Sequence, residues 1–92
     1  VEPVALKVDS WQSKYLRTLP LHHTQVEVEC NEEYSIFEYR LCPSFDFRKK
    51  ILSMGATTEV LAPAELITKV REEGIAEYTQ PNEEYKFKVY KK

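Results

Sequence analysis

Apolar and polar positions alternate along three stretches of the chain, and each alternation predicts a strand with one buried face. The first stretch covers residues 4–8. The other two, residues 25–30 and 34–41, flank a polar turn at residues 31–33. Two alternating runs joined by a short polar turn predict a β-hairpin.

The alternation also assigns side chains to the two faces of the expected sheet. Residues at every second position share a face, because successive side chains of a strand point in opposite directions. The residues that we expect to face the core are Val4, Leu6, Val8, Phe37, Tyr39 and Leu41. Those that we expect on the opposite face of the hairpin arm are Ile36, Glu38 and Arg40.

A spacing of three to four residues between apolar positions predicts helices. In the first, Ser10 is the N-cap candidate, Trp11, Tyr15 and Leu19 share one face, and Pro20 ends the helix.

The second helix begins after Ser44, another N-cap candidate, and places Phe47, Ile51 and Met54 on one side. Gly55 stands where a helix ends in a residue with positive φ.

A strand and a third helix follow the glycine. Residues 57–61 are rich in β-branched side chains and short enough for a strand. Pro63 is suited to the first turn of a helix that carries Leu66, Ile67 and Val70 on one side.

The expected order is therefore strand, helix, strand, strand, helix, strand and one further helix. With right-handed crossovers this order gives an α+β ferredoxin-like βαββαβ sandwich, with two helices on one face of an antiparallel sheet and an additional C-terminal helix. We assign residues 1–80 to this domain and residues 81–92 to a C-terminal tail. The alternating residues 85–90 favour either a short edge strand or a segment that becomes ordered against a missing domain or partner.

Composition limits the function. A chain of 92 residues with 42% hydrophobic content suits one small domain. Its 13 basic and 15 acidic residues give a net charge of -2, so the whole molecule does not attract nucleic acid or a membrane surface. Two cysteines and the lack of a long apolar run predict a soluble, cytoplasmic protein. Because the chain starts at Val1 without an initiator Met, we expect that it was cut from a longer polypeptide.

Three stretches carry a resemblance to a known family: residues 17–25 (RTLPLHHTQ), 45–47 (FDF) and 55–63 (GATTEVLAP). Together they resemble the C-terminal part of bacterial WYL-domain transcriptional regulators. These proteins join an N-terminal helix-turn-helix domain, a WYL domain with a small Sm-like barrel and a C-terminal extension called WCX. The chain resembles the extension alone, over about residues 4–80.

The resemblance implies a ferredoxin-like fold and a role in transcription regulation. The implied function is non-enzymatic: sensing of an effector, single-stranded DNA or a nucleotide-like ligand, and transmission of its binding to the DNA-binding state of the regulator. The implied partners are the upstream WYL and helix-turn-helix domains of the same chain and a second copy in a homodimer. The alternative is a purely structural dimerisation module. Direct promoter binding by this fragment is not expected.

The two histidines allow two interpretations. His22 and His23 are neighbours on an extended stretch, so we expect their side chains to diverge rather than to chelate one metal ion. In one interpretation, one ring packs near the helix-to-strand turn and the other faces solvent. In the other, a polar corner accepts an anionic effector, and its ligand-binding residues are Lys14, Arg17, His22, His23 and Gln25. No metal or cofactor is predicted.

A basic run on the second helix, Arg48, Lys49 and Lys50, is typical of a solvated face, and phosphate contact is its weaker functional alternative. Phe37 and Tyr39 raise the alternative of an RNA-binding sheet. Because the glycine-containing RNA-binding motif is missing and the first strand has no aromatic residue, core packing is favoured.

The sequence does not indicate an enzyme. Its serines lack a nucleophile elbow, and Cys30 and Cys42 form no Cys-x-x-Cys pair. These cysteines lie at opposite ends of the hairpin, about 25 Å apart, too far for a disulfide. Small phosphatases share the ferredoxin-like fold, so an acylphosphatase-like enzyme that uses Arg17 is a rival hypothesis based on analogy.

Overall fold

The structure is a computed structural model that describes residues 1–62, 64–70, 72 and 85–90. Its strands are β1 (Glu2–Asp9), β2 (Val26–Cys30), β3 (Tyr34–Leu41) and β4 (Thr58–Ala62). Its helices are α1 (Ser10–Thr18), α2 (Phe45–Met54) and α3 (Ala64–Val70), with a short 3-10 turn (Gly55–Thr57) between α2 and β4. The predicted order of elements is confirmed.

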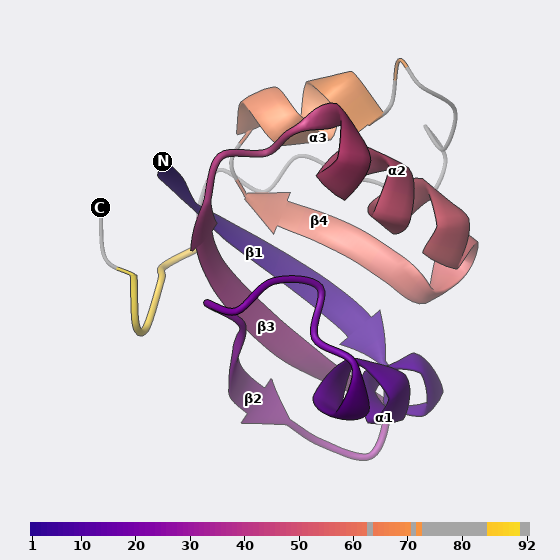
Figure 1. Ribbon diagram of the computed structural model, residues 1–92. Coiled ribbons are helices and arrows are strands. Elements are labelled where there is room, and N and C mark those ends of the chain that lie inside the picture. Colours follow the sequence, from indigo (N-terminus) through magenta and orange to yellow (C-terminus); the bar gives the residue numbers. More distant parts are fainter. Residues whose placement is uncertain (63, 71, 73–84, 91–92) are drawn as a thin grey trace.

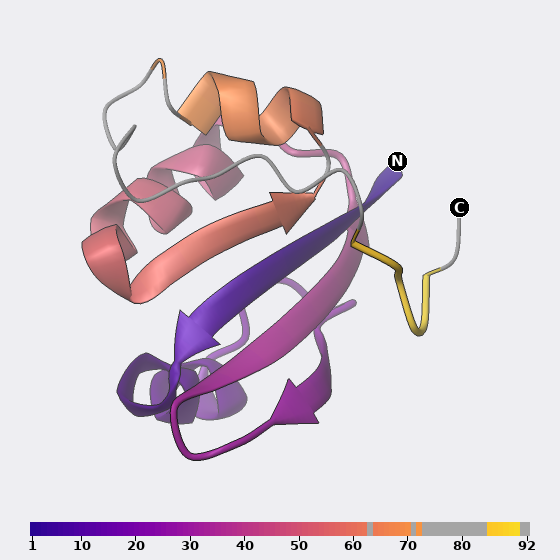
Figure 2. The same cartoon turned by 180° about the vertical axis from the view of Figure 1, so that it is seen from behind.

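The four strands form one antiparallel sheet in the order β2-β3-β1-β4. The two central strands are thus β1 and β3, and each β-α-β unit crosses over one neighbouring strand, as in a ferredoxin-like sandwich. Figure 1 shows α1 and α2 in front of the sheet and α3 beyond β4, and Figure 2 shows the sheet from its other side. The predicted α+β fold with an extra C-terminal helix is confirmed.

The main core lies between the sheet and the helices. All three helices contribute to it through Leu16 of α1, Phe47 and Ile51 of α2, and three residues of α3. The buried residues of this core are Val4, Leu6, Val8, Leu16, Phe37, Tyr39, Leu41, Phe47, Ile51, Val60, Leu66, Ile67 and Val70. The predicted core face of β1 and β3 is therefore confirmed, and the two rings proposed for base stacking are buried.

The apolar face of α1 points to solvent. Trp11, Tyr15 and Leu19, which share this face, are 63%, 55% and 75% exposed, respectively. The helix instead buries Ser13 and Leu16. Ser13 can turn inward because its hydroxyl donates a hydrogen bond to the carbonyl oxygen of Asp9 at 2.7 Å.

The N-cap of α1 is not the predicted residue, whereas the N-cap of α2 is. For α1 the N-cap is Asp9, one residue before the predicted Ser10, and its carboxylate accepts the backbone N–H of Gln12 at 2.7 Å. For α2 the N-cap is Ser44, as predicted. Gly55 ends α2 with φ of 58°, a backbone conformation that residues with a Cβ rarely adopt. Its predicted role as the positive-φ residue at the end of the helix is therefore confirmed.

A β-bulge interrupts the hairpin at Val28. Glu27 pairs with Phe37 and Glu29 with Ile36, so Val28 is the extra residue of β2. Glu27 therefore reaches α1 on the inner side, where it binds Arg17, whereas Glu29 binds Tyr34 and Lys88 on the outer side. The simple alternation expected for residues 25–30 does not hold past the bulge.

The tail prediction is corrected for residues 85–90. These residues form an irregular segment with bends rather than an edge strand (Figure 2, yellow). Tyr85 and Phe87 pack on the outer face of the sheet, against a small cluster that includes Ala5, Ile36 and Leu61. The predicted helix start at Pro63 and the remaining tail residues lie outside the described residues.

Candidate functional site

The predicted anion-accepting corner lies where α1 ends, the chain turns, and β2 begins. Its five members play different parts in the structure. Two are engaged in internal hydrogen bonds, one lies over an aromatic ring, and the two histidines form a pair.

Arg17 binds a carboxylate of the protein itself. Its Nε and Nη2 donate to Oε1 and Oε2 of Glu27 at 2.8 and 2.7 Å, and Nη2 also lies 3.2 Å from Oγ of Ser35. This bidentate pair lowers the pKa of Glu27 to about 2, chiefly through the hydrogen bonds from Arg17. Arg17 therefore links α1 to β2 and β3.

Gln25 is also a structural residue. Its Oε1 accepts the hydroxyl of Tyr39 at 2.6 Å and the backbone N–H of Leu21 at 3.1 Å. Its Nε2 donates to the carbonyl oxygen of Leu16 at 2.8 Å. One side chain thus joins the end of α1, the following loop and the centre of the sheet, and so fixes the loop that carries the histidines.

His22 and His23 do not diverge as predicted. Their ring centroids lie 4.3 Å apart with an angle of 31° between the planes. The cause is a tight turn: the backbone N–H of Thr24 donates to Nδ1 of His22 at 3.2 Å, and the hydroxyl of Thr24 lies 2.8 Å from the same nitrogen. The extended backbone assumed from the sequence is therefore absent at this point.

The turn also sets the protonation of His22. Because Nδ1 accepts the Thr24 N–H, it carries no proton, and the neutral ring holds its proton on Nε2. Burial lowers the pKa of His22 below the ordinary 6.5, and the charges of His23 and Lys50 lower it further. The neutral form of His22 therefore offers Nε2–H as a hydrogen-bond donor.

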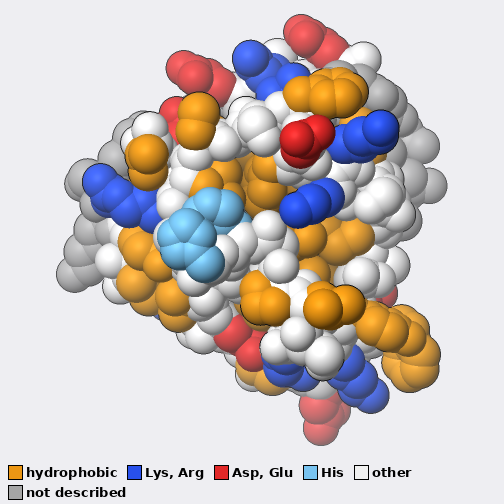
Figure 3. Space-filling model, in the orientation of Figure 1, with side chains coloured by type: hydrophobic (Ala, Val, Ile, Leu, Met, Phe, Trp, Pro, Cys, Tyr) orange, Lys and Arg blue, Asp and Glu red, His pale blue; other side chains and the backbone are white. Residues whose placement is uncertain are grey.

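Lys50 is the member of the basic run whose charge acts on a histidine. It contributes, after burial and His23, to the lowered pKa of His22. Figure 3 shows the two histidines together on one face, with Lys or Arg side chains to either side. We call His22, His23 and Lys50 the His-Lys surface.

The other basic candidates lie against aromatic rings. Lys14 Nζ lies 5.1 Å from the centroid of the Trp11 ring. Arg48 and Lys49 each lie 5.9 Å from the Phe45 ring, and Nη1 of Arg48 donates to the carbonyl oxygen of Pro43 at 3.2 Å. The weaker phosphate-contact candidates are therefore divided: Arg48 and Lys49 lie near an aromatic ring, whereas the charge of Lys50 acts on His22.

Sequence reasoning missed Thr24, which orients His22, and the electrostatic effect of Lys50 on His22. The His-x-Thr spacing was a signal for the turn, because a hydroxyl two residues on can bond back to the ring. The placement of α1 and α2 on one side of the sheet was implied by the predicted fold, but the effect of one lysine of α2 on a histidine of the loop was not.

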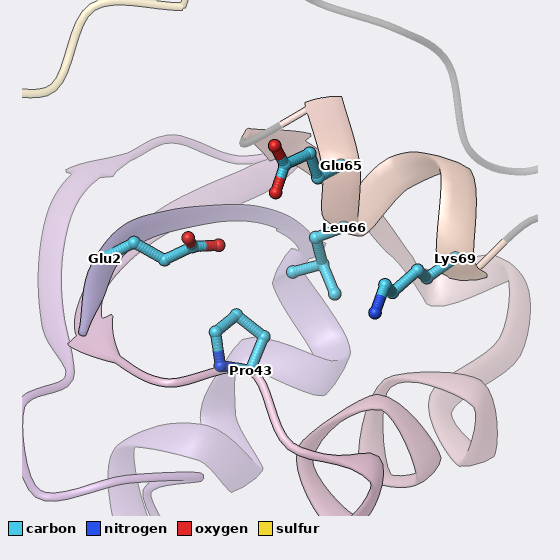
Figure 4. A pocket seen from close by; sticks show the side chains of 5 residues that line it. All are labelled: Glu2, Pro43, Glu65, Leu66 and Lys69. Carbon is cyan, nitrogen blue, oxygen red and sulfur yellow. The ribbon is translucent and has the colours of Figure 1, made fainter.

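A separate hollow of about 180 Å³ lies at the start of β1. Figure 4 shows Glu2, Pro43, Glu65, Leu66 and Lys69 around it. It is smaller than the roughly 300–1,000 Å³ typical of sites for drug-sized ligands. The predicted ligand-binding residues do not line it.

Within the described residues, no three His, Cys, Asp or Glu side chains are grouped to hold a metal ion. Cys30 and Cys42 are both free and exposed. Across the described part of the chain, every helix is too short or too polar to span a membrane.

Comparison with protein families gives a match over most of the chain. The family model described as the WCX domain matches residues 1–75. No curated protein and no solved structure matches the chain. WCX domains are regulatory rather than enzymatic, and their usual setting is the WYL-type regulators. With the family match covering most of the 92 residues and the ferredoxin-like order of elements in agreement, the chain belongs to the WCX domain family.

Proposed function

We propose that this WCX domain is a non-enzymatic sensor of an anionic effector, single-stranded DNA or a nucleotide-like ligand, in a WYL-type helix-turn-helix transcription regulator. The observation that supports the proposal is the pair of histidines with ring centroids 4.3 Å apart, together with the charge of Lys50, which acts on His22. The partners are the upstream WYL and helix-turn-helix domains of the same chain and a second copy in a dimer.

The chemistry of the surface suits a phosphate group. Lys50 supplies a positive charge, and His22 supplies its Nε2–H as a donor. A bound anion would favour the charged form of the ring, so its arrival would raise the pKa of His22. Effector binding would therefore be coupled to proton uptake, which adds a second positive charge to the site at pH near 7.

The loop around His22 provides a route for transmission. Thr24 contacts His22 and also accepts the backbone N–H of Arg40 in β3 at 3.0 Å. A change at His22 would thus act on the end of β3 and, through Lys50, on α2. Regulation also requires two states of the whole regulator with different affinities for the effector.

The test measures binding of a fluorescently labelled oligothymidine to the full chain by anisotropy, at low and moderate salt. Wild type should bind more weakly as salt rises, because phosphate contacts release counterions. Lys50→Gln should weaken binding about two- to fivefold, the effect of one exposed charge pair.

The matched control is Lys7→Gln, which also removes one positive charge. Lys7 lies on β1, and its Nζ is 4.5 Å from the centroid of the Tyr34 ring. It should leave the affinity nearly unchanged. Equal losses in the two variants, or no salt-dependent binding by wild type, would contradict the proposal.

Dimerisation without effector sensing is the second candidate. It is favoured by the exposed face of α1, where Trp11, Tyr15 and Leu19 lie next to one another and the rings of the first two are 6.3 Å apart. Sedimentation over a concentration series tests it: the full chain should dimerise and Trp11→Ser should prevent this. A chain that stays monomeric at all concentrations counts against this candidate.

A further inference from the structure

The outer face of the sheet carries a buried carboxylate. Glu38 lies on central strand β3, on the face opposite the helices, and is 0% exposed. A buried carboxylate is costly unless hydrogen bonds satisfy its oxygens. The partners of Glu38 therefore show what this face is built to hold.

Four hydrogen bonds reach Glu38 from residues 85–90. Oε2 accepts the hydroxyl of Tyr85 at 2.5 Å and the backbone N–H of Lys88 at 2.7 Å. Oε1 accepts the backbone N–H groups of Val89 and Tyr90 at 2.7 and 3.4 Å. Three successive backbone N–H groups that converge on one carboxylate form an anion nest, supplied here by the tail.

Contacts on either side of Glu38 define the rest of the site. Tyr85 and Phe87, with ring centroids 5.0 Å apart, pack on the outer apolar cluster. Lys88 Nζ pairs with Oε1 of Glu29 at 2.9 Å. The hydroxyl of Tyr90 donates to the carbonyl oxygen of Thr24 at 2.6 Å. Apolar packing, charge pairing and hydrogen bonds together therefore involve five of the residues 85–90: Tyr85, Phe87, Lys88, Val89 and Tyr90.

We propose that the outer face of the sheet is a peptide-recognition site whose ligand is the C-terminal segment of this same chain, residues 85–90. The site takes a basic, aromatic segment of the pattern Tyr-x-Phe-Lys, and Glu38 is its central acceptor. None of its contacts depends on a covalent connection between segment and sheet. The site therefore binds the same sequence as a separate peptide once the attached segment is disabled. This inference is independent of the proposed effector function.

The test uses the full chain carrying Tyr85→Ser and Phe87→Ser, which removes the two aromatic anchors but keeps Glu38. A synthetic peptide of residues 85–90 is titrated into this variant and into wild type, with amide NMR shifts and calorimetry as readouts. The variant should bind the peptide saturably, with shifts at Ala5, Ile36 and Leu61. Wild type should bind it at least about tenfold more weakly, because the attached segment competes at an effective concentration in the millimolar range.

Adding Glu38→Gln to the variant should weaken peptide binding about tenfold or more, because it removes charge-assisted hydrogen bonds. Glu32→Gln, in the exposed hairpin turn, makes the same change of charge and should leave binding unaffected. Absence of saturable binding by the variant, or equal binding with and without Glu38→Gln, overturns the proposal.

A second measurement needs no variant of the tail. In the wild-type chain, the amides of Lys88, Val89 and Tyr90 should exchange with solvent more slowly than in an unstructured peptide, and Glu38→Gln should remove this protection. Exchange at the unstructured rate in wild type overturns the proposal.

Discussion

Replacing Gln25 by Ala should destabilise the fold rather than only weaken effector binding. The side chain makes three hydrogen bonds, to the Tyr39 hydroxyl, the Leu21 N–H and the Leu16 carbonyl oxygen. Tyr39 is fully buried, and burial raises the pKa of its phenol, so the hydroxyl stays protonated and needs an acceptor.

The three lost hydrogen bonds differ in cost. An unsatisfied buried hydroxyl costs about 1–3 kcal/mol, whereas the partly buried groups of Leu21 and Leu16 can bind water and cost less. The expected loss in free energy of unfolding for Gln25→Ala is therefore about 2–4 kcal/mol. A small domain has about 5–15 kcal/mol in total, so the variant should remain folded but be easily measured.

Urea unfolding followed by circular dichroism measures this loss, and a double-mutant cycle with Tyr39→Phe separates its main part. In wild type, Tyr39→Phe should cost about 1 kcal/mol, because it removes a hydrogen bond. In the Gln25→Ala background it should restore stability, because no hydroxyl is left without an acceptor. A loss below about 0.5 kcal/mol for Gln25→Ala, or equal effects of Tyr39→Phe in both backgrounds, would refute the reasoning.

Three further predictions concern stability, each measured by urea unfolding. The pKa of Glu27 is lowered from 4.5 to about 2, so its pair with Arg17 stabilises the fold fully above pH 4.5, and this stabilisation is lost as the pH falls towards 2. In Glu27→Gln, the free energy of unfolding should therefore decrease less steeply over this pH range. Leu16→Ala should cost about 2–5 kcal/mol, whereas Trp11→Ala, on the exposed side of the same helix, should cost less than about 1 kcal/mol. Gly55→Ala should cost about 1–2 kcal/mol through its positive φ alone, because an added Cβ meets no atom within 4 Å.

The sheet and the second helix could be predicted because their signals are local. Alternation in β1 and β3, the Ser44 cap and the glycine after Met54 each constrain the backbone within a few residues. The face of α1 could not be predicted in this way. Its apolar residues do share one side, but Ser13 and Leu16 face the core. Which side of so short a helix is buried depends on the part of the sheet against which it packs.

The internal contacts of the predicted site residues could not be derived from the sequence. A basic side chain such as Arg17 is equally suited to an external anion and to an internal carboxylate, and only the fold places Glu27 within its reach. The bulge at Val28 places Glu29 on the outer face of the sheet, opposite to Glu27. The alternation of apolar and polar residues does not indicate this change of face. The burial of Glu38 depends on residues about 50 positions away, beyond any local signal.

The effector-sensing account is tested most directly by the pKa of His22 itself. Ring-proton NMR of the full chain over a pH series gives this value with and without a saturating oligothymidine at low salt. The account predicts a pKa below 6.5 in the free chain and a rise on binding, with the rise reversed by moderate salt. A His22 pKa at or above 6.5 in the free chain, or one that the oligonucleotide leaves unchanged, would contradict it.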